Sequence, residues 1–528
     1  METDTIILGN GPSAMILSYI LHGHLPYYSP QHPHPDPLLH AKLKGAPALL
    51  GANVDALTEH FAASRLSYST QALPVNVLLD TLVRPSVDVE ELQSVTNVEW
   101  RHEPEKAVPH RVLGNAPRPG GQWTENPMPA SWEIQTLSYA SMLSLPGYSF
   151  ADHYRKTMGK ELPAYTRPSR QETADYFQAY PEAVGIDDAF SSNENVWGIT
   201  RHEDGFFLRS HNIRCKRLVL ASGIFSEVLQ PRPLLRPLTS FQPVPETPLL
   251  VIGSGFSAAD VIISAPGNQK IIHVFKWDPE NRPSPLRGCH QHAYPEYAGV
   301  YRLMRRAAVA ANPTAKRVKP LRTTSSPFLE SRSWAYVYEG FPNTEIIDVQ
   351  TQEELAIVTF RRHDGTTFTR PVRGMVYATG RRGTLDYLDQ NLAQEVIGSD
   401  DTEVNTTISG QTLRGKAIEN VEVAKDVFII GSLTGDSLIR FAYGSCVQAA
   451  GNLINKFTGD HKVENTQAPV SKQEVCIGVM RGIDGHDVYP NNRQPCSYQD
   501  DHAVVSPEFA PPKGMWTWLM GIWRWSGS

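Results

Sequence analysis

The sequence is poor in the features that mark several large classes of protein. Its 528 residues include five cysteines, none of them in a CxxC pair: Cys215, Cys289, Cys446, Cys476 and Cys496. An odd and scattered set of cysteines argues against a disulfide framework and fits a reducing compartment. No apolar run reaches the roughly 20 residues of a membrane-spanning helix, and no signal-peptide pattern is present. We therefore expect a cytoplasmic protein.

An excess of charge of either sign is also missing. The net charge is −6, with 41% hydrophobic and 20% charged residues, which is typical of a globular protein. There is no basic patch of the kind that binds nucleic acid, so we expect no nucleic-acid partner. At about 150 residues per domain, the length predicts two to four domains.

What the sequence does contain is one short pattern that occurs twice. "TIILGNGPSA" covers residues 5–14, and "LLVIGSGFSA" covers residues 249–258. Each copy has a short apolar run typical of a buried strand, then a GxGxxA turn, then an apolar pattern of helical type. The first helix is expected to end before Gly23, a candidate C′ glycine.

The spacing of the small residues has a physical reason. The first glycine permits a tight turn, the second lets backbone N–H groups approach a pyrophosphate, and the third small residue lets helix and strand pack closely. Two such turns predict an α/β fold with two Rossmann-like dinucleotide-binding domains, and the usual pair of ligands is a flavin and a nicotinamide dinucleotide. The candidate cofactor-binding residues are Gly9, Gly11, Pro12, Ser13 and Ala14 in the first turn and Gly253, Gly255, Phe256, Ser257 and Ala258 in the second.

The residue that follows the next strand indicates which dinucleotide binds at the second turn. The expected strand 271–275 is followed by Lys276 and has no acidic residue at its end. A cation at this place suits a 2′-phosphate, which favours NADPH over NADH. The alternative is an ordinary solvated lysine at a strand end.

The first turn lacks the corresponding signal. The next expected strand, 25–30, has no acidic residue at its end to hold an adenosine ribose, and the nearest carboxylate is Asp36. We assign FAD to this site because the N-terminal domain of two-dinucleotide flavoproteins normally binds the flavin. His32 and His34 lie among prolines with no third ligand nearby, so we predict no metal site.

Three later segments fit a flavoprotein. "RLVLASG" (217–223) and "GMVYATG" (374–380) are expected strands that connect the two nucleotide domains, and they add Ala221, Gly223 and Gly380 to the candidates. Residues 426–454 are expected to form a buried strand, a Gly435-Asp436 turn and a long helix. Asp436 is a candidate acceptor for a ribityl chain, and the helix start near Phe441 is expected to direct its positive dipole at the flavin.

Several motifs occur in an order that resembles one family. "GNGPSA", "HPHP", "PGGQW" (119–123), "YPEY" (294–297), "IGSGFSAAD" and "GDSLIRF" together resemble the oxidative stress-induced growth inhibitor family and, more distantly, the class B flavin monooxygenases. The resemblance covers roughly residues 3 to 457. It implies tightly bound FAD, NADPH as reductant, and oxygen insertion through a flavin C4a-hydroperoxide.

The resemblance also implies site residues. "PGGQW" matches the GGxW segment that lies against the isoalloxazine, so Gly120, Gly121, Gln122 and Trp123 are expected near the flavin. Gln122, Trp123 and Arg440 are the candidates for shaping the flavin environment. A capping box of Ser169 and Glu172 predicts the start of a helix like the one after the substrate-side loop of these enzymes, although a purely structural helix is the alternative.

Missing motifs narrow the expected reaction. The link 225–248 has no FxGxxxH segment, which argues against a typical Baeyer–Villiger enzyme, and the absent cysteine pair argues against a disulfide reductase. We expect a monooxygenase that uses O₂ on a small organic substrate, with N-hydroxylation or related heteroatom or carbon oxygenation favoured. Two alternatives are a regulatory flavoprotein with weak redox activity and an NADPH oxidase that releases hydrogen peroxide.

The expected domain boundaries follow from these assignments. The FAD-binding domain covers 1–240 and 376–458, the NADPH-binding domain covers 245–375, and residues 459–528 form a C-terminal extension. The extension ends in "GMWTWLMGIWRWSGS" (514–528), which is either a peripheral membrane anchor or a tail that packs on the body of the protein. The sequence does not indicate an oligomeric state.

Overall fold

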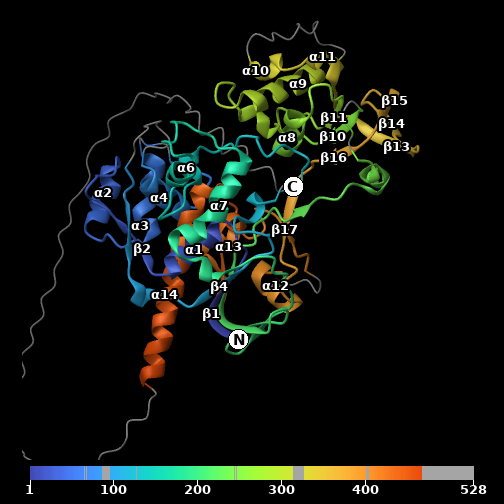
Figure 1. The fold of residues 1–528 in the computed structure, drawn as a ribbon. Coiled ribbons are helices and arrows are strands. Elements are labelled where there is room, and N and C mark those ends of the chain that lie inside the picture. The colour runs from blue at the N-terminus through green and yellow to red at the C-terminus, as the bar shows by residue number, and fades with distance from the viewer. Residues whose placement is uncertain are drawn as a thin grey trace, which may run out of the picture.

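The computed structural model describes most of the chain up to Thr466. The described residues are 1–64, 66, 68–85, 95–125, 128–242, 244, 247–312, 326–399 and 404–466. Figure 1 shows two groups of elements: a larger group that contains α1, α7 and α14, and a second group that contains α8, α9 and β10. Each group is built around a parallel sheet.

The first sheet gathers strands from distant parts of the chain. Its strand order is β19-β20-β8-β1-β4-β5, with the β6–β7 hairpin attached to β8. The central strands β20, β8, β1, β4 and β5 pair in parallel. The strands are β1 (Glu2–Leu8), β4 (His110–Leu113), β5 (Phe190–Ser191), β6 (Ile199–His202), β7 (Gly205–Leu208), β8 (Ile213–Leu220), β19 (Glu422–Ala424) and β20 (Val427–Ile429).

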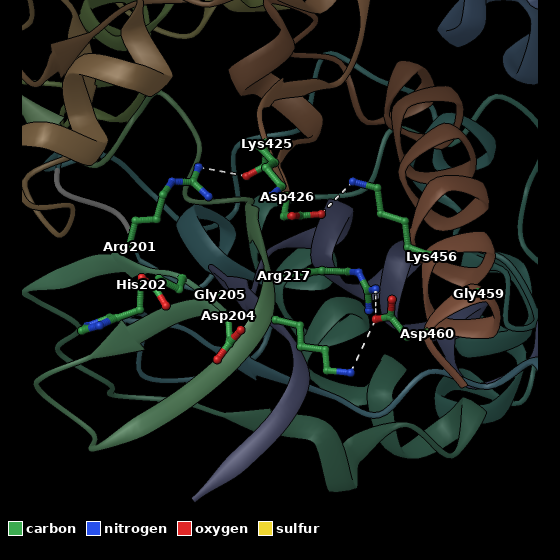
Figure 2. A pocket seen from close by; sticks show the side chains of 12 residues that line it. Arg201, His202, Asp204, Gly205, Arg217, Lys425, Asp426, Lys456, Gly459 and Asp460 are labelled. Atoms are coloured by element: carbon green, nitrogen blue, oxygen red, sulfur yellow. Dashed lines mark hydrogen bonds and ion pairs between the residues drawn. The ribbon is translucent and has the colours of Figure 1, made fainter. Parts of the chain in front are cut away.

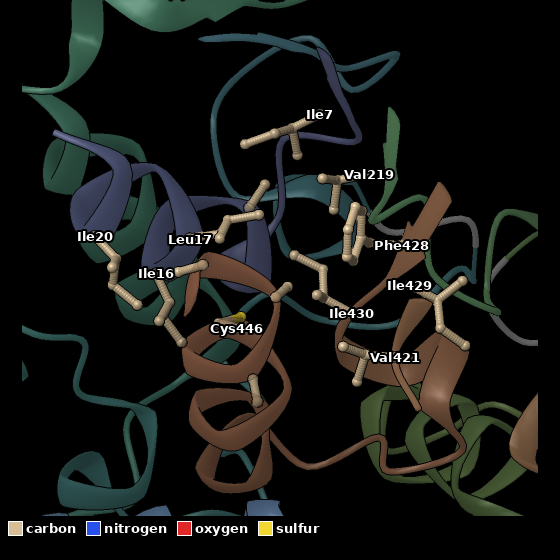
Figure 3. Packing of buried hydrophobic residues seen from close by; sticks show 14 of the residues in the cluster. Ile7, Ile16, Leu17, Ile20, Val219, Val421, Phe428, Ile429, Ile430 and Cys446 are labelled. Atoms are coloured by element: carbon tan, nitrogen blue, oxygen red, sulfur yellow. The ribbon is translucent and has the colours of Figure 1, made fainter. Parts of the chain in front are cut away.

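The helices of this group cover the sheet with apolar faces. They are α1 (Pro12–Leu21), α2 (Pro37–Lys44), α3 (Val54–Thr58), α4 (Pro74–Val83), α5 (Ala140–Leu143), α6 (Phe150–Met158), α7 (Arg170–Val184), α12 (Gln390–Ile397), α13 (Arg414–Glu419) and α14 (Ala442–Thr466). Figure 3 shows Ile16, Leu17 and Cys446, from α1 and α14, in one cluster with Ile7 and Phe428 of the sheet. All five side chains are fully buried. This packing fixes α1 directly behind the first glycine turn.

The local predictions for the first turn are confirmed. Strand β1 ends at Leu8, the turn follows, and α1 begins at Pro12 with a proline in its first turn. The helix ends at Leu21, and Gly23 follows with φ = +94°, a conformation that glycine adopts without steric cost. The second expected strand, however, does not join the sheet.

The strand after α1 is displaced from its expected place. β2 (His24–Tyr28) forms a separate antiparallel pair with β3 (Val98–His102), and β4 takes the position beside β1. The expected strand is therefore present, but it does not lie beside β1, where the second strand of a dinucleotide-binding unit was expected. Asp36 is also engaged elsewhere, because its carboxylate caps α2 and accepts hydrogen bonds from His60 and Tyr68. Strand pairing over about 70 residues of sequence is not visible in a local pattern.

In the sequence, the strands of the second sheet lie between β8 and β19 of the first sheet. Its order is β12-β11-β10-β16, and all its pairs are parallel. The elements are β10 (Leu249–Ile252), β11 (Ile271–Phe275), β12 (Tyr338–Pro342), β16 (Met375–Tyr377), α8 (Phe256–Ser264), α9 (Pro295–Ala311), α10 (Pro327–Glu330) and α11 (Trp334–Val337). The strand predicted over 271–275 is confirmed residue for residue.

Two small antiparallel sheets complete the described chain. β13 (Glu345–Thr351), β14 (Ala356–Arg361) and β15 (Thr367–Val372) extend the second group, and β9 (Glu227–Val228), β17 (Arg381–Thr384) and β18 (Thr407–Ile408) lie where the chain crosses between the groups. The predicted fold class is confirmed: an α/β chain with two parallel, Rossmann-like units.

Side chains of the "YPEY" segment hold the two groups together. The Tyr294 hydroxyl donates to the Leu137 carbonyl oxygen at 2.9 Å, and its ring lies 4.7 Å from the Arg167 guanidinium carbon. Ser264 at the end of α8 accepts from the Ser131 amide at 2.8 Å. The segment around residues 128–137 therefore belongs to the interface between the two groups.

Within the described residues, no helix combines the length and apolar character needed to cross a membrane. The tryptophan-rich segment 514–528, for which we predicted either an anchor or a packed tail, lies outside the described residues.

Candidate functional site between the two glycine turns

The first glycine of each turn is locked by the same contact. Gly9 has φ = +111°, and a Cβ there would collide with the Ala221 carbonyl oxygen. Gly253 has φ = +148°, and a Cβ there would collide with the Ala378 carbonyl oxygen. Ala221 and Ala378 follow β8 and β16, so both units place the same kind of strand end against the same glycine. Nothing but glycine fits either position without moving the backbone.

The second glycine of each turn has open space beside it. Gly11 has φ = −83° and Gly255 has φ = −103°, which any residue can adopt. A Cβ on Gly11 would have only the Gly121 Cα within 4 Å, at 4.0 Å, and a Cβ on Gly255 only Pro285 Cγ, also at 4.0 Å. The fold therefore does not need glycine here, whereas a pyrophosphate approaching the backbone does. The residues around this space therefore fit the diphosphate of a dinucleotide.

The other predicted residues of the turns lie at the helix starts. Pro12, Ser13 and Ala14 open α1, and Phe256, Ser257 and Ala258 open α8. Ala14 and Ala258 are buried, as their packing role requires, whereas the other four are half-buried. Each helix thus presents its amino end, with its free N–H groups and positive dipole, toward the open glycine.

The GGQW loop folds over the first turn. The Gly120 amide donates to the Asn10 carbonyl oxygen at 2.8 Å. Gly121, at φ = +57°, approaches so closely that a Cβ on it would lie 3.0 Å from the Gly11 Cα. Trp123 is half-buried and lies 5.9 Å from the Phe177 ring, centroid to centroid. The structure therefore brings Gly120 and Gly121 to the first turn, as predicted, and places Trp123 against Phe177 of α7.

Gln122 occupies a different place from its neighbours. Its side chain is exposed, and its backbone carbonyl accepts a hydrogen bond from the Arg170 guanidinium at 2.8 Å. Arg170 is the first residue of α7, whose capping box of Ser169 and Glu172 is present as predicted. In this arrangement the backbone of Gln122 is fixed by α7, and its amide side chain is left to solvent.

The Gly435-Asp436 turn is present, and its carboxylate already has partners within the chain. As predicted, it follows the buried strand β20 and precedes the long helix α14. Asp436 accepts from the Leu73 amide at 2.8 Å and the Asn76 side chain at 2.7 Å, and it pairs with Arg414 at 2.9 Å. A hydrogen bond to a ribityl chain would therefore share these oxygens. The role of Asp436 as a ribityl acceptor stays a prediction.

Arg440 is buried in an ion pair. Its guanidinium donates to the Asp80 carboxylate from Nε at 2.8 Å and from a second nitrogen, and Asp80 also pairs with Arg84 at 2.9 Å. Arg440 is 4% exposed. Phe441, its neighbour directly before α14, is buried as well. The geometry gives Arg440 a structural partner, and its predicted effect on the flavin stays untested.

The remaining predicted residues line the ends of β8, β16 and β11. Gly223 and Gly380 have φ = +74° and +128°, so both strand ends turn sharply. Lys276 follows β11 directly and is exposed. Because β11 lies beside β10, its end is at the edge where a ribose phosphate of a dinucleotide on the second turn would lie.

Sequence reasoning missed two side chains that support the turns. The Asn10 amide nitrogen lies 3.2 Å from the carbonyl oxygens of Ala116 and Arg118, which ties the first turn to the GGQW loop. His273 is fully buried in β11, with Nε2 2.7 Å from the Gly253 carbonyl oxygen and Nδ1 2.8 Å from the Tyr338 hydroxyl. Burial lowers the pKa of His273 to about 4, so the ring is neutral and Nε2–H donates to Gly253.

A hollow lies away from the glycine turns, at the amino end of β20 and the far end of α14 (Figure 2). Its volume is about 670 Å³, and its lining is highly charged. The cations there are paired with carboxylates: Arg217 with Asp4 and Asp460, and Lys456 with Asp426. This network neutralises itself and stabilises the sheet edge, so we place the functional site at the glycine turns.

The fold and the two turns define a class: an α/β protein with two dinucleotide-binding-type units, the second inserted into the first. Comparison with known proteins finds similar sequences. The chain is 27% identical over 497 residues to oxidative stress-induced growth inhibitor 1 of Mus musculus, covering 86% of this chain and 95% of the mouse protein. It is 28% identical over 355 residues to oxidative stress-induced growth inhibitor 2 of Homo sapiens, covering 57% and 68%. These relatives confirm the resemblance drawn from the motifs.

A flavin-containing monooxygenase from Stenotrophomonas maltophilia is among the similar solved structures. Its TM-score is 0.47 at 13% identity, with 87% of this chain and 99% of that chain covered. No protein-family model matches the sequence.

Proposed function

We propose that this chain is an FAD-dependent, NADPH-consuming monooxygenase. It transfers one atom of O₂ to a small organic substrate, and the other atom leaves as water with electrons from NADPH. N-hydroxylation or a related heteroatom or carbon oxygenation is favoured over Baeyer–Villiger chemistry. The observation that carries this proposal is the repeated turn, in which one glycine is required by the fold and the next leaves open space.

The two cofactors are assigned by position. FAD is proposed at the first turn, in a domain formed by residues 1–240 and 376–458, and NADPH at the second turn, in a domain formed by residues 245–375. The GGQW loop supports the flavin assignment because it lies directly on Gly11. Lys276 supports the 2′-phosphate, since it is a cation at the end of β11. No metal takes part in this proposal.

The chain's own residues bind the cofactors, orient them and shield the site from water. The flavin, when bound, supplies the chemistry that activates oxygen. The open glycines and the amino ends of α1 and α8 receive the diphosphates. Trp123, packed on Phe177 next to the GGQW glycines, is proposed to help exclude water from the flavin site, which protects a reactive species from hydrolysis. Arg170 holds the loop in place through the carbonyl of Gln122.

A stopped-flow experiment on the purified protein tests the reaction class. The bound flavin is reduced with NADPH and mixed with oxygen, while its absorbance spectrum and the released peroxide are followed. A long-lived species that absorbs unlike oxidised or reduced flavin supports the monooxygenase. Immediate return of oxidised flavin with one peroxide per NADPH contradicts it and indicates an oxidase. Absence of any flavin reduction indicates the alternative, a regulatory flavoprotein with weak redox activity. The relatives' name, growth inhibitor, is compatible with that alternative.

The assignment of NADPH to the second turn leads to a separate prediction for Lys276. Lys276→Ala is expected to raise the dissociation constant for NADP⁺ about tenfold, the factor of one charge-assisted hydrogen bond, and to leave that for NAD⁺ unchanged. Lys270→Ala is the matched control, because Lys270 directly precedes the same strand at its opposite end and is also exposed. Isothermal titration calorimetry gives all four constants. An equal effect of both substitutions contradicts the assignment.

A further inference from the structure

Three charged side chains from the two glycine-turn units interact electrostatically. Arg170 begins α7 in the first unit, Asp260 lies in α8 behind the second turn, and Arg381 begins β17 directly after Gly380. Both arginines act electrostatically on the Asp260 carboxyl and on each other. The proposed function as described so far uses neither Asp260 nor Arg381.

Only some of the hydrogen-bond donors of Arg170 have partners. One terminal nitrogen donates to the carbonyl oxygens of Gln122 and Glu125, and the guanidinium carbon lies 5.3 Å from the Trp132 ring centroid. Its Nε is buried and has no hydrogen-bond partner. Burial lowers the pKa of Arg170, although it stays charged at neutral pH. Arg170 therefore carries a buried donor that is not used within the described chain.

Arg381 has even fewer partners. Its side chain is half-buried, and its guanidinium makes neither a hydrogen bond nor an ion pair with any residue that the structure describes. Burial, together with the positive charge of Arg170, lowers the pKa of Arg381. Two like charges thus lie near each other in a partly dry place, an arrangement that is costly unless an anion joins them.

The carboxylate nearby does not neutralise this pair. Asp260 forms no ion pair within 4 Å with either arginine, and its Oδ1 accepts a hydrogen bond from the Tyr297 hydroxyl at 2.8 Å. Burial raises the pKa of Asp260 to about 6, despite the two arginines. Positive charge therefore exceeds negative charge at the junction of the two units.

We propose that Arg170 and Arg381 form a binding site for an oxyanion between the two glycine turns. Guanidinium groups suit this task, because their fixed fork of donors matches the oxygens of a phosphate or carboxylate. The anion is either the diphosphate of the dinucleotide on the second turn or an acidic group of the oxygenated substrate. The proposal rests on the proposed function for its ligands, and the binding site itself is tested without turnover.

The test measures anion binding to the purified full chain by isothermal titration calorimetry. The probes are sodium pyrophosphate, sodium acetate and NADP⁺, each titrated into the unaltered protein, Arg381→Ala, Arg381→Lys and Arg361→Ala. Arg361 is the matched control: it is an exposed arginine of β14 that pairs with Glu345, away from the junction. Arg381 is chosen over Arg170 because Arg170 also holds the GGQW loop. Thermal melting checks that each variant folds.

The expected result is a loss of about tenfold or more in the affinity of at least one probe on Arg381→Ala, with partial recovery in Arg381→Lys and no change in Arg361→Ala. Weaker binding of NADP⁺ and pyrophosphate identifies the dinucleotide diphosphate. Weaker binding of acetate or pyrophosphate with unchanged NADP⁺ binding identifies a substrate group. Equal affinities of Arg381→Ala and Arg361→Ala for all three probes overturn the proposal. Because flavin turnover is not needed, this failure is distinct from failure of the monooxygenase reaction.

Discussion

The two glycines of each GxGxxA turn have different roles, and substitution separates them. Gly253→Ala places a Cβ against the Ala378 carbonyl oxygen in a backbone conformation that alanine rarely adopts. We expect it to lower the free energy of unfolding by at least about 2 kcal/mol. Gly267→Ala, in the same unit with open space around it, is the control. Urea denaturation measures both, and equal stabilities would show that the turn is not locked.

Substitution of Arg440 tests whether this residue stabilises the fold or shapes the flavin environment. Arg440→Met leaves Asp80 buried with Arg84 alone, so we expect a loss of about 3 kcal/mol in the free energy of unfolding. Arg361→Met breaks an exposed pair with Glu345 and is expected to cost about 0–1 kcal/mol. The same denaturation experiment compares them. A stable Arg440→Met protein with an altered flavin spectrum would instead support the predicted role beside the flavin.

Asp260 of α8 interacts with groups on α7, α9 and β17. The free energy of unfolding is therefore expected to depend on pH through this carboxyl. Tyr297 on α9 donates to Asp260, while the charges of Arg170 on α7 and Arg381 on β17 act on its carboxyl. The folded pKa of about 6 lies above the ordinary carboxyl value of 3.8, so the folded state binds the proton more tightly than the unfolded state. Stability from this group is therefore greatest below about pH 4 and is lost as pH rises to about 6.

The substitution Asp260→Asn removes that titration. We expect the difference in unfolding free energy, unaltered protein minus Asp260→Asn, to fall between pH 4 and pH 6 and to level off above. Denaturant unfolding at several pH values gives the difference directly. A difference that rises over this interval would mean that the arginines, and not burial, dominate the carboxyl.

Elements whose signals are local were predictable, and those built from distant segments were not. The two turns, α7 with its capping box and the 271–275 strand follow from adjacent residues. The place of β2 depends on pairing with β3, some 70 residues later in the chain. Asp80, the partner of Arg440, and Asn76, one partner of Asp436, each lie 360 residues away in the chain. Burial and pairing of such side chains exist only in the folded molecule, so a local motif does not reveal whether a carboxylate is free for a ligand.

The whole molecule combines one sheet that is interrupted in sequence with a second sheet inserted into it. Both place an open glycine and a helix amino end at the same kind of edge, and the 128–137 segment and Tyr294 join them. This duplication is the central claim of the account: one chain with two separate dinucleotide sites, each dependent on its own second glycine.

The most direct measurement is the number of FAD and NADP⁺ molecules bound per chain, by flavin absorbance and calorimetry, in the unaltered protein, Gly11→Ala and Gly255→Ala. Both substitutions have room for the new Cβ and are expected to fold. The account predicts one FAD and one NADP⁺ per chain, loss of FAD in Gly11→Ala, and loss of NADP⁺ with FAD retained in Gly255→Ala. Binding of both ligands unchanged in the two variants, or no binding in the unaltered protein, would contradict it.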